Sequence, residues 1–150
     1  MEQIFSAENT FDRATTWFIS DLHIGHGNVL RFEEGLHNFA DIKEHDQTIA
    51  KNWHETVGED DHVFFLGDLA MERTKFKHIR ENLGKFGKLP GKVHWIIGNH
   101  DLHIDQAWLY NLREVMDIVE FTNYKEIMIK DDSDWGFKRF VLFHYPLYEW

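Results

Sequence analysis

Three short apolar segments, each followed at once by polar residues, constrain the fold of this chain more than any other feature. The segments cover residues 17–19, 63–66 and 93–97, and they consist mainly of aromatic and β-branched residues. Continuous apolar segments of this length are typical of strands that are buried on both faces of a sheet. We therefore expect three buried strands in an α/β domain.

The stretches between these segments have helical periodicity. Residues 41–57 begin with Asp41, which can cap a helix N-terminus together with Glu44 three residues later. Residues 74–83 place apolar side chains at helical spacing and are followed by Gly84, a typical helix end. The order strand, helix, strand, helix, strand predicts parallel strands that are joined by right-handed crossovers.

The second half of the chain has a different pattern. Residues 106–112 fit a short helix. Three further segments fit strands, at residues 118–121, 124–129 and 137–143. We expect these later strands to be antiparallel, with the polar residues 130–134 as an exposed connection. Because no linker divides the sequence, we expect a single domain over residues 1–150.

The composition limits the possible chemistry. The 16 basic and 26 acidic residues give a formal net charge of −10, which disfavours a bare polyanion site because phosphate contacts need positive potential. Bound divalent cations could reverse that potential locally. Cysteine is absent, which excludes disulfides, thiolate zinc sites, a cysteine nucleophile and iron–sulfur clusters. Any metal would therefore be held by nitrogen and oxygen, and the 11 histidines supply the nitrogen.

Neither a signal peptide nor a membrane-spanning segment is indicated. Residues 1–5 contain no basic region that is followed by an apolar stretch. No apolar run approaches the roughly 20 residues that are needed to cross a bilayer. We expect a cytoplasmic protein without a membrane partner.

Polar side chains that can bind metal follow four predicted strands at their C-terminal ends, which is where open α/β sheets bind ligands. They are Asp21, His23, Asp68, Asn99, His100, Asp101 and His144. Carboxylate, imidazole and amide groups are ligands for divalent transition metals. Asp21 and His23 would face the same way in an extended segment, and Asp68 has two oxygens with which it could bridge two ions. Two cations roughly 3.5–4 Å apart form a clamp for in-line displacement at phosphorus.

Each of these clusters also has a structural interpretation. An Asp-x-His sequence is commonly a turn, Asp68 could cap a helix, and residues 99–101 could form a turn between a strand and a helix. His144 could be a hydrogen-bonded core histidine. Four strand ends that all carry ligand-type side chains favour one shared site over four unrelated turns.

The order of these clusters resembles the motifs of the calcineurin-like metallophosphoesterases. The matching sequences are Asp21-x-His23, Gly67-Asp68, Gly98-Asn99-His100-Asp101 and the later His144. The similarity is strongest to small single-domain bacterial and phage members, on residues 17–28 and 143–147 followed by Trp150, and it extends from Trp17 to the last residue. The resemblance implies two mixed β-sheets packed as a sandwich and flanked by helices, with the site at the strand ends.

The resemblance also implies a role for each residue. Asp21 and His23 would bind a first divalent ion, Asp68 would bridge, and Asn99 and His144 would bind a second ion. A hydroxide between the ions would be the nucleophile. His100 would act as general acid or as a cation beside the leaving group, and Asp101 would orient it and stabilise its charge. Manganese is the metal expected first, and iron, nickel, zinc and magnesium are alternatives.

One family feature is missing. The family normally completes both metal shells with a Gly-His-x-His motif on a further strand, and none follows Leu147 in this sequence. Gly25-His26-Gly27 lies in the first loop and is no substitute. Either the chain stops short of this motif, or it is a short form whose open coordination positions are filled by water or by a partner chain.

Three residues near the first motif are candidates for substrate binding. His26 and Asn28 could contact a substrate phosphate, although Asn28 could instead cap a short helix that begins at Val29. Arg31 could clamp a phosphate or be a solvated surface charge.

The expected reaction is hydrolysis of a phosphomonoester or phosphodiester.

Residues 73–92 carry seven basic residues against one acidic residue. This stretch is either a solvated face or a patch that steers a nucleotide or nucleic-acid substrate toward the site. A nuclease and a catalytically weak binding protein on the same fold are therefore the alternatives.

Overall fold

The structure is a computed structural model that describes residues 9–32, 39–130 and 136–146. Its strands are β1 (Thr10–Asp12), β2 (Thr16–Ile19), β3 (His62–Phe65), β4 (Leu89–Ile96), β5 (Met116–Thr122), β6 (Lys125–Lys130) and β7 (Phe137–Leu142). Its α-helices are α1 (Val29–Phe32), α2 (Ile42–Thr56), α3 (Phe76–Leu83) and α4 (Gln106–Leu112). Short 3₁₀ helices are η2 (Arg13–Thr15), η3 (Gly84–Phe86) and η4 (Asn99–Asp101). None of the described helices is long and apolar enough to cross a membrane.

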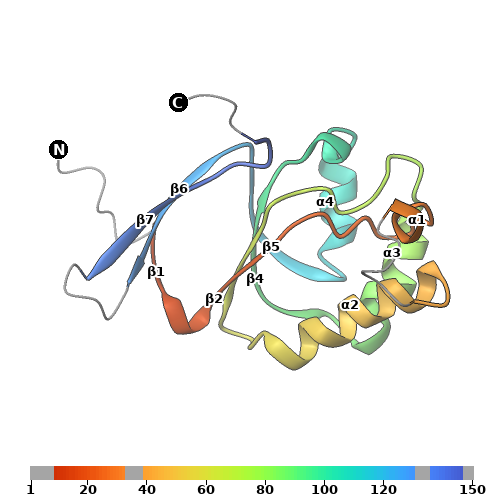
Figure 1. Ribbon diagram of the computed structural model, residues 1–150, viewed down its shortest axis with the longest axis horizontal. Helices are drawn as coiled ribbons and strands as arrows, with labels where there is room; N and C mark the ends of the chain where they lie inside the picture. Colours follow the sequence, from red (N-terminus) through yellow and green to blue (C-terminus); the bar gives the residue numbers. More distant parts are fainter. Residues whose placement is uncertain (1–8, 33–38, 131–135, 147–150) are drawn as a thin grey trace.

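The strands form two sheets. Four of them pair in the order β2-β3-β4-β5, parallel throughout, and the other three pair in the order β1-β6-β7, with β1 parallel and β7 antiparallel to β6. Figure 1 shows the three-stranded sheet on one side of the four-stranded sheet and α2, α3 and α4 on the other. The expected fold class, a two-sheet α/β sandwich flanked by helices, is confirmed, with the larger sheet fully parallel and the smaller one mixed.

The alternation of side chains along β3 explains this layering. Val63 and Phe65 pack into the core that α2, α3 and α4 cover, whereas Phe64 packs into a second core against the three-stranded sheet. Successive side chains of a strand point to opposite faces, so a continuous apolar segment is buried on both sides. The strands expected at the first three apolar segments are present as β2, β3 and β4. Burial is confirmed for β3 and β4 but is wrong for β2, which is the edge strand of its sheet and leaves Trp17 and Phe18 36% and 45% exposed.

The expected helices are present, and α2 begins as predicted. The Asp41 carboxylate accepts a hydrogen bond from the Glu44 amide at 2.8 Å, while the Glu44 carboxylate accepts one from the amide of Ala40 at 2.6 Å. Asp41 therefore satisfies an amide that an uncapped helix end would leave unpaired, and Glu44 reaches back to the amide that precedes the cap rather than to that of Asp41. The connection over residues 130–134 lies almost wholly outside the described residues.

The prediction that all later strands are antiparallel is wrong for β5. The helix α4 connects β4 to β5, and this crossover returns the chain so that β5 runs parallel to β4. Only β6 and β7 form the expected antiparallel pair. Strand β1 was not predicted, because Phe11 is its only buried residue.

A row of four hydrogen-bonded polar side chains lies on the face of the four-stranded sheet that is turned toward the smaller sheet. Lys125 Nζ lies 2.6 Å from Glu120 Oε2, and the same oxygen lies 3.1 Å from His94 Nδ1. His94 Nε2 lies 2.9 Å from His62 Nδ1. Burial is the main cause that lowers the pKa of both histidines below the usual value; for His94 the hydrogen bond to Glu120 acts in the opposite direction.

These lowered pKa values predict sensitivity to acid. Below the ordinary histidine pKa the unfolded chain binds protons that folded His62 and His94 do not, so the free energy of unfolding should fall as the pH drops from 7 to 5. His94→Gln should flatten this dependence by at most about 1.4 kcal/mol per pH unit. Denaturant unfolding at several pH values, with a chelator present, measures the slope. His54→Gln is the control, and equal slopes for His94→Gln and wild type would contradict the assignment.

Candidate metal centre

The loops that follow β2 and β3 run side by side. The Asp21 amide donates to the Gly67 carbonyl at 2.9 Å, and the His23 amide donates to the Asp68 carbonyl at 3.1 Å. These bonds continue the pairing of β2 with β3 beyond the regular strands. Segments 47 residues apart in sequence, those of Asp21 and Asp68, are thereby held next to each other.

Three residues of these loops have left-handed backbone conformations. Asp21, His23 and Asp68 have φ values of 55°, 45° and 60°, and they are the only described non-glycine residues with positive φ. This conformation costs roughly 1–2 kcal/mol per residue. It persists where surrounding contacts impose it, and such residues cluster at functional sites. All three were predicted as metal ligands from sequence, but the expectation that Asp21 and His23 lie in an extended segment is wrong, because both have left-handed backbones.

Two glycines allow the strand-end loops to approach each other. A Cβ atom on Gly67, whose φ is +92°, would lie 2.5 Å from the Gly98 nitrogen and 2.9 Å from His144 Nδ1. A Cβ atom on Gly98 would lie 2.2 Å from Asp68 Oδ1. The backbone of Gly98 is extended, with φ −91°, so space rather than backbone conformation excludes any larger residue there.

Gly98→Ala is therefore expected to displace the Asp68 carboxylate and to weaken metal binding at least 100-fold. The reason is that the added methyl group occupies the position of Asp68 Oδ1. Calorimetric titration with Mn²⁺ measures the affinity. The matched control is Gly27→Ala, because a Cβ atom there meets no atom within 4 Å. If both variants bound Mn²⁺ like the wild type, the close approach would have no role in metal binding.

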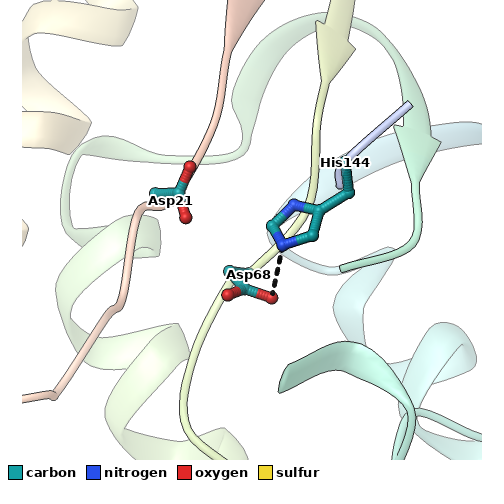
Figure 2. A group of neighbouring side chains, drawn as sticks. All are labelled: Asp21, Asp68 and His144. Atoms are coloured by element: carbon teal, nitrogen blue, oxygen red, sulfur yellow. Dashed lines mark ion pairs between the residues drawn. The ribbon is translucent and has the colours of Figure 1, made fainter. Parts of the chain in front are cut away.

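Three predicted ligands meet in one place. Asp21, Asp68 and His144 each offer an atom within 4.8 Å of the others. Figure 2 shows that they come from three separate chain segments, with the His144 ring turned toward Asp68. His144 Nε2 lies 3.6 Å from Asp68 Oδ1, and His23 Nε2 lies 4.0 Å from Asp68 Oδ2 and 3.6 Å from Asp21 Oδ1. The two oxygens of Asp68 thus face two different groups of ligands.

The hydrogen bonds of His144 leave one nitrogen suited to a cation. Its Nδ1 donates to the Leu66 carbonyl at 2.6 Å, so Nε2 is the ring nitrogen left for a cation, to which a metal-binding histidine offers its lone pair. That lone pair faces Asp68 Oδ1 and also Asn99 Oδ1, which is 3.0 Å away. Electron-rich atoms that converge in this way fit a divalent cation between them, and a backbone carbonyl on the opposite ring nitrogen is typical of metal-binding histidines.

His100 and His26 complete a group of three rings at this site. The His100 amide donates to Asp68 Oδ1 at 2.9 Å, and its Nε2 lies 4.0 Å from Asp68 Oδ2. The ring centroids of His26 and His100 each lie 5.6 Å from that of His23. Burial, and then the charges of His23 and His100, lower the pKa of His26 below its usual value. The structure therefore places the His26 ring beside His23, and a role in substrate binding stays a prediction.

Asp101 has a different position from the one expected. Its carboxylate is 1% exposed and accepts four hydrogen bonds. The donors are the amides of Asp68, Leu69 and Gly98 and the indole nitrogen of Trp95, at 2.8–3.0 Å. Within the described part of the chain, no hydrogen bond joins Asp101 to the His100 ring. The expectation that Asp101 orients His100 is therefore corrected: its hydrogen bonds fix the loop that carries Asp68.

The other predicted substrate contacts are not brought to the ligands. Asn28 and Arg31 are exposed at the start of α1, and no hydrogen bond joins their side chains to the site within residues 9–32, 39–130 and 136–146.

In the basic stretch at residues 73–92, four basic side chains form ion pairs with acidic ones. The ion pairs are Lys77–Glu81, Arg80–Glu114, Lys88–Asp117 and Lys92–Asp60. This pairing favours the interpretation of the stretch as a solvated face.

The sequence analysis missed a buried carboxylate behind the first loop. Asp46 on α2 accepts a hydrogen bond from the Gly25 amide at 3.0 Å. The sequence could have indicated this burial, because Asp46 lies four residues after Ile42 and four before Ala50, on the apolar face of α2. A carboxylate on an apolar helix face is unusual enough to be noticed.

The chain is similar to a known protein family and to a solved structure. A family model described as calcineurin-like phosphoesterase matches residues 14–149. A solved structure, of a protein of unknown function from Aquifex aeolicus called AQ665, superimposes with a TM-score of 0.60 at 26% identity. That match covers 87% of this chain and 60% of the other.

Two relatives are more similar in sequence. Gene 66 protein of Mycobacterium phage L5 is 44% identical over 89 residues, which is 59% of this chain and 40% of that protein. Uncharacterized protein MJ1445 of Methanocaldococcus jannaschii is 33% identical over 113 residues, which is 75% of this chain and 56% of that protein. The chain thus spans about half the length of these relatives.

Proposed function

The chain belongs to the calcineurin-like phosphoesterase family, and we propose that it hydrolyses a phosphomonoester or phosphodiester with two divalent metal ions. The observation that carries the proposal is the position of Asp68. Its Oδ2 faces His23, which is close to Asp21, and its Oδ1 faces His144, which is close to Asn99. Asp21 and His144 also offer atoms within 4.8 Å of each other, so the two sides of Asp68 are adjacent, and a buried carboxylate in this position is suited to bridge two neighbouring cations.

These contacts support the division of ligands that the family resemblance implies. Asp21 and His23 would hold one ion, Asn99 and His144 would hold the other, and Asp68 would contact both. The bound ions would supply an activated water near neutral pH and positive charge for the phosphoryl oxygens. Manganese is the metal we propose first, and iron, nickel, zinc and magnesium accept the same nitrogen and oxygen ligands.

The protein groups around the ligands support this reaction. The hydrogen bond from His144 to Leu66 fixes which ring nitrogen faces the site. The amide of His100 donates to Asp68 and so holds one carboxylate oxygen in position. The His100 ring, with its side chain 32% exposed, lies beside the ligands on a side open to solvent. It would hold a proton at Nε2 that the leaving oxygen could take.

The charge distribution favours a small phosphoester over a long polyanion. Four cations of the basic stretch are neutralised by nearby acids, and the chain carries a net charge of −10. A nucleic acid needs a continuous positive surface along its backbone. We therefore propose a substrate whose recognition depends on the metal-bound phosphoryl group.

The proposal is tested by hydrolysis assays on the metal-depleted chain after addition of Mn²⁺. Nitrophenyl phosphate reports phosphomonoesterase activity, and bis-nitrophenyl phosphate reports phosphodiesterase activity. Asp68→Asn is the matched inactive variant, because it keeps the side-chain shape while removing the bridging charge. Rates equal to those of Asp68→Asn on both substrates, with every metal named above, would rule out the proposed function for this chain.

Metal should also stabilise the fold. Asp21 and Asp68 lie close together, and a cation relieves their repulsion. Mn²⁺ at about 100 times its dissociation constant should add about 2.7 kcal/mol, which corresponds to roughly 5–10 °C in Tm for a chain of this size. Thermal unfolding in Mn²⁺ and in chelator measures the shift. Asp68→Asn should show little shift, and identical curves for the wild type would exclude a site of useful affinity.

A further inference from the structure

The Asp46 carboxylate lies in the interior between α2 and the loop after β2. It is 0% exposed, and its side-chain hydrogen bonds within the described residues come from a backbone amide and from two histidines. Its Oδ2 accepts from the Gly25 amide at 3.0 Å and lies 2.9 Å from His78 Nε2. Its Oδ1 lies 3.0 Å from His45 Nδ1. An ionised carboxylate only accepts hydrogen bonds, so His45 Nδ1 and His78 Nε2 act as its donors. Asn82 Nδ2 also lies 2.9 Å from His78 Nε2; because both atoms then carry protons, this approach is a packing contact and not a hydrogen bond.

His78 on α3 also contacts the same loop directly. A Cβ atom on Gly25, whose φ is +76°, would lie 3.0 Å from His78 Cδ2 and 3.1 Å from Thr74 Cγ2. The loop therefore packs closely against α3 and its N-terminal side, and Asn82 one turn later donates to the His78 carbonyl at 3.0 Å. In Figure 1, α2 and α3 lie next to each other beside this loop.

This contact is two residues from His23, whose backbone is left-handed, with φ 45°. One side of the loop is held by the β3 loop, through the bond from the His23 amide to Asp68 and the next one from Ile24 to Leu69. The other side is held by Asp46 and His78. A left-handed histidine persists only where contacts on both sides impose it.

We propose that Asp46, oriented by His78, is a positioning residue that holds the 23–25 segment so that His23 faces Asp68. Asp46 touches neither the ligands nor the place where substrate would react, so it would act through the Gly25 amide. The proposal rests on the proposed metal-dependent function. Supporting groups behind metal ligands typically change metal affinity 10–100-fold when they are removed.

The test compares variants that differ only in this contact. Asp46→Ala removes the acceptor for the Gly25 amide, whereas Asp46→Asn keeps an oxygen that can accept it. His78→Leu removes the donor that orients Asp46, and it changes a side chain that is 36% exposed, so it should fold even if Asp46→Ala does not. His54→Leu, on the same helix α2 but packed against Phe86, is the control.

Two readouts are measured. The first is hydrogen exchange of the Gly25 amide in the metal-free protein, followed by NMR. The second is the dissociation constant for Mn²⁺. We expect Asp46→Ala and His78→Leu to exchange the Gly25 amide at least 10-fold faster and to bind Mn²⁺ 10–100-fold more weakly. Asp46→Asn should restore affinity to within about threefold of the wild type, and His54→Leu should change neither quantity.

The outcomes separate this inference from the proposed function. Failure of the wild-type chain to bind Mn²⁺ would overturn the proposed function, whatever the Gly25 exchange shows. Wild-type affinity in both Asp46→Ala and His78→Leu would overturn the positioning role alone. The same affinity loss in His54→Leu, or no recovery in Asp46→Asn, would show general destabilisation instead and would also overturn it.

Discussion

Asp101→Ala is expected to lower the free energy of unfolding of the metal-free protein by about 4 kcal/mol, because a buried donor left without a partner costs roughly 1–3 kcal/mol. The substitution leaves four donors unpaired: the amides of Asp68, Leu69 and Gly98 and the Trp95 indole. A domain of this kind has only about 5–15 kcal/mol in total. Denaturant unfolding in the presence of a chelator measures the loss without any contribution from metal.

Asp105→Ala is the control for this variant. Asp105 lies four residues later and caps α4 with a single exposed hydrogen bond to the Trp108 amide at 2.9 Å. Loss of such a cap costs about 1 kcal/mol. If Asp101→Ala were no less stable than Asp105→Ala but lost catalysis, Asp101 would act through His100 as the family resemblance implied. A large loss of stability in the metal-free protein supports the structural role.

The prediction of the fold succeeded where the sequence pattern alone determines structure. The segment at residues 63–66 is continuous and apolar, and β3 is indeed buried on both faces, with Phe64 in one core and Phe65 in the other. The direction of β5 was missed because direction depends on the connection. Strand β5 contains alternating exposed residues, which fit an antiparallel sheet, but the short helix α4 brings the chain back in parallel.

The sequence predicted that polar residues after the strand ends lie close together, and three of them do; their roles stay a prediction. Asp21, Asp68 and His144 meet because β2, β3 and β7 all end at the same place. The partners of Asp101 could not be predicted, because a carboxylate next to His100 in sequence can turn toward either the ring or the backbone. The structure turns it toward the amides of a loop 33 residues earlier, that of Asp68.

The hydrogen-bond partners of Asp46 could not be predicted from the sequence for a related reason. Gly25 is 21 residues away in sequence and His78 is 32 residues away. The packing of the loop after β2 against α2 brings Gly25 to Asp46, and the packing of α3 against α2 brings His78 there. The helical spacing of Asp46 from Ile42 and Ala50 is a signal for its burial that was not used. That spacing does not show which donors satisfy the carboxylate.

His100→Asn should separate proton transfer from metal binding. His100 lies beside Asp68, with Nε2 4.0 Å from Oδ2, and within the described residues it is bonded to the ligands only through its backbone amide. A proton given to the leaving oxygen contributes typically 10²–10⁴ in rate. The substitution should therefore slow the hydrolysis of alkyl phosphate esters by about that factor. Nitrophenyl esters, whose leaving group departs without a proton, should be slowed much less.

The metal content of the variant decides between the two possible roles of the ring. Asparagine keeps the backbone amide that donates to Asp68 Oδ1, so His100→Asn should bind Mn²⁺ within a few-fold of the wild type. Asp68→Asn should instead lose metal and lose activity equally on good and poor leaving groups, because the bridging charge serves every substrate. Equal slowing of both ester types by His100→Asn, or loss of its metal, would make His100 a ligand or a general electrostatic contact. A difference that grows with the pKa of the leaving group assigns it to the leaving oxygen, since only the proton donor becomes dispensable when the leaving group is good.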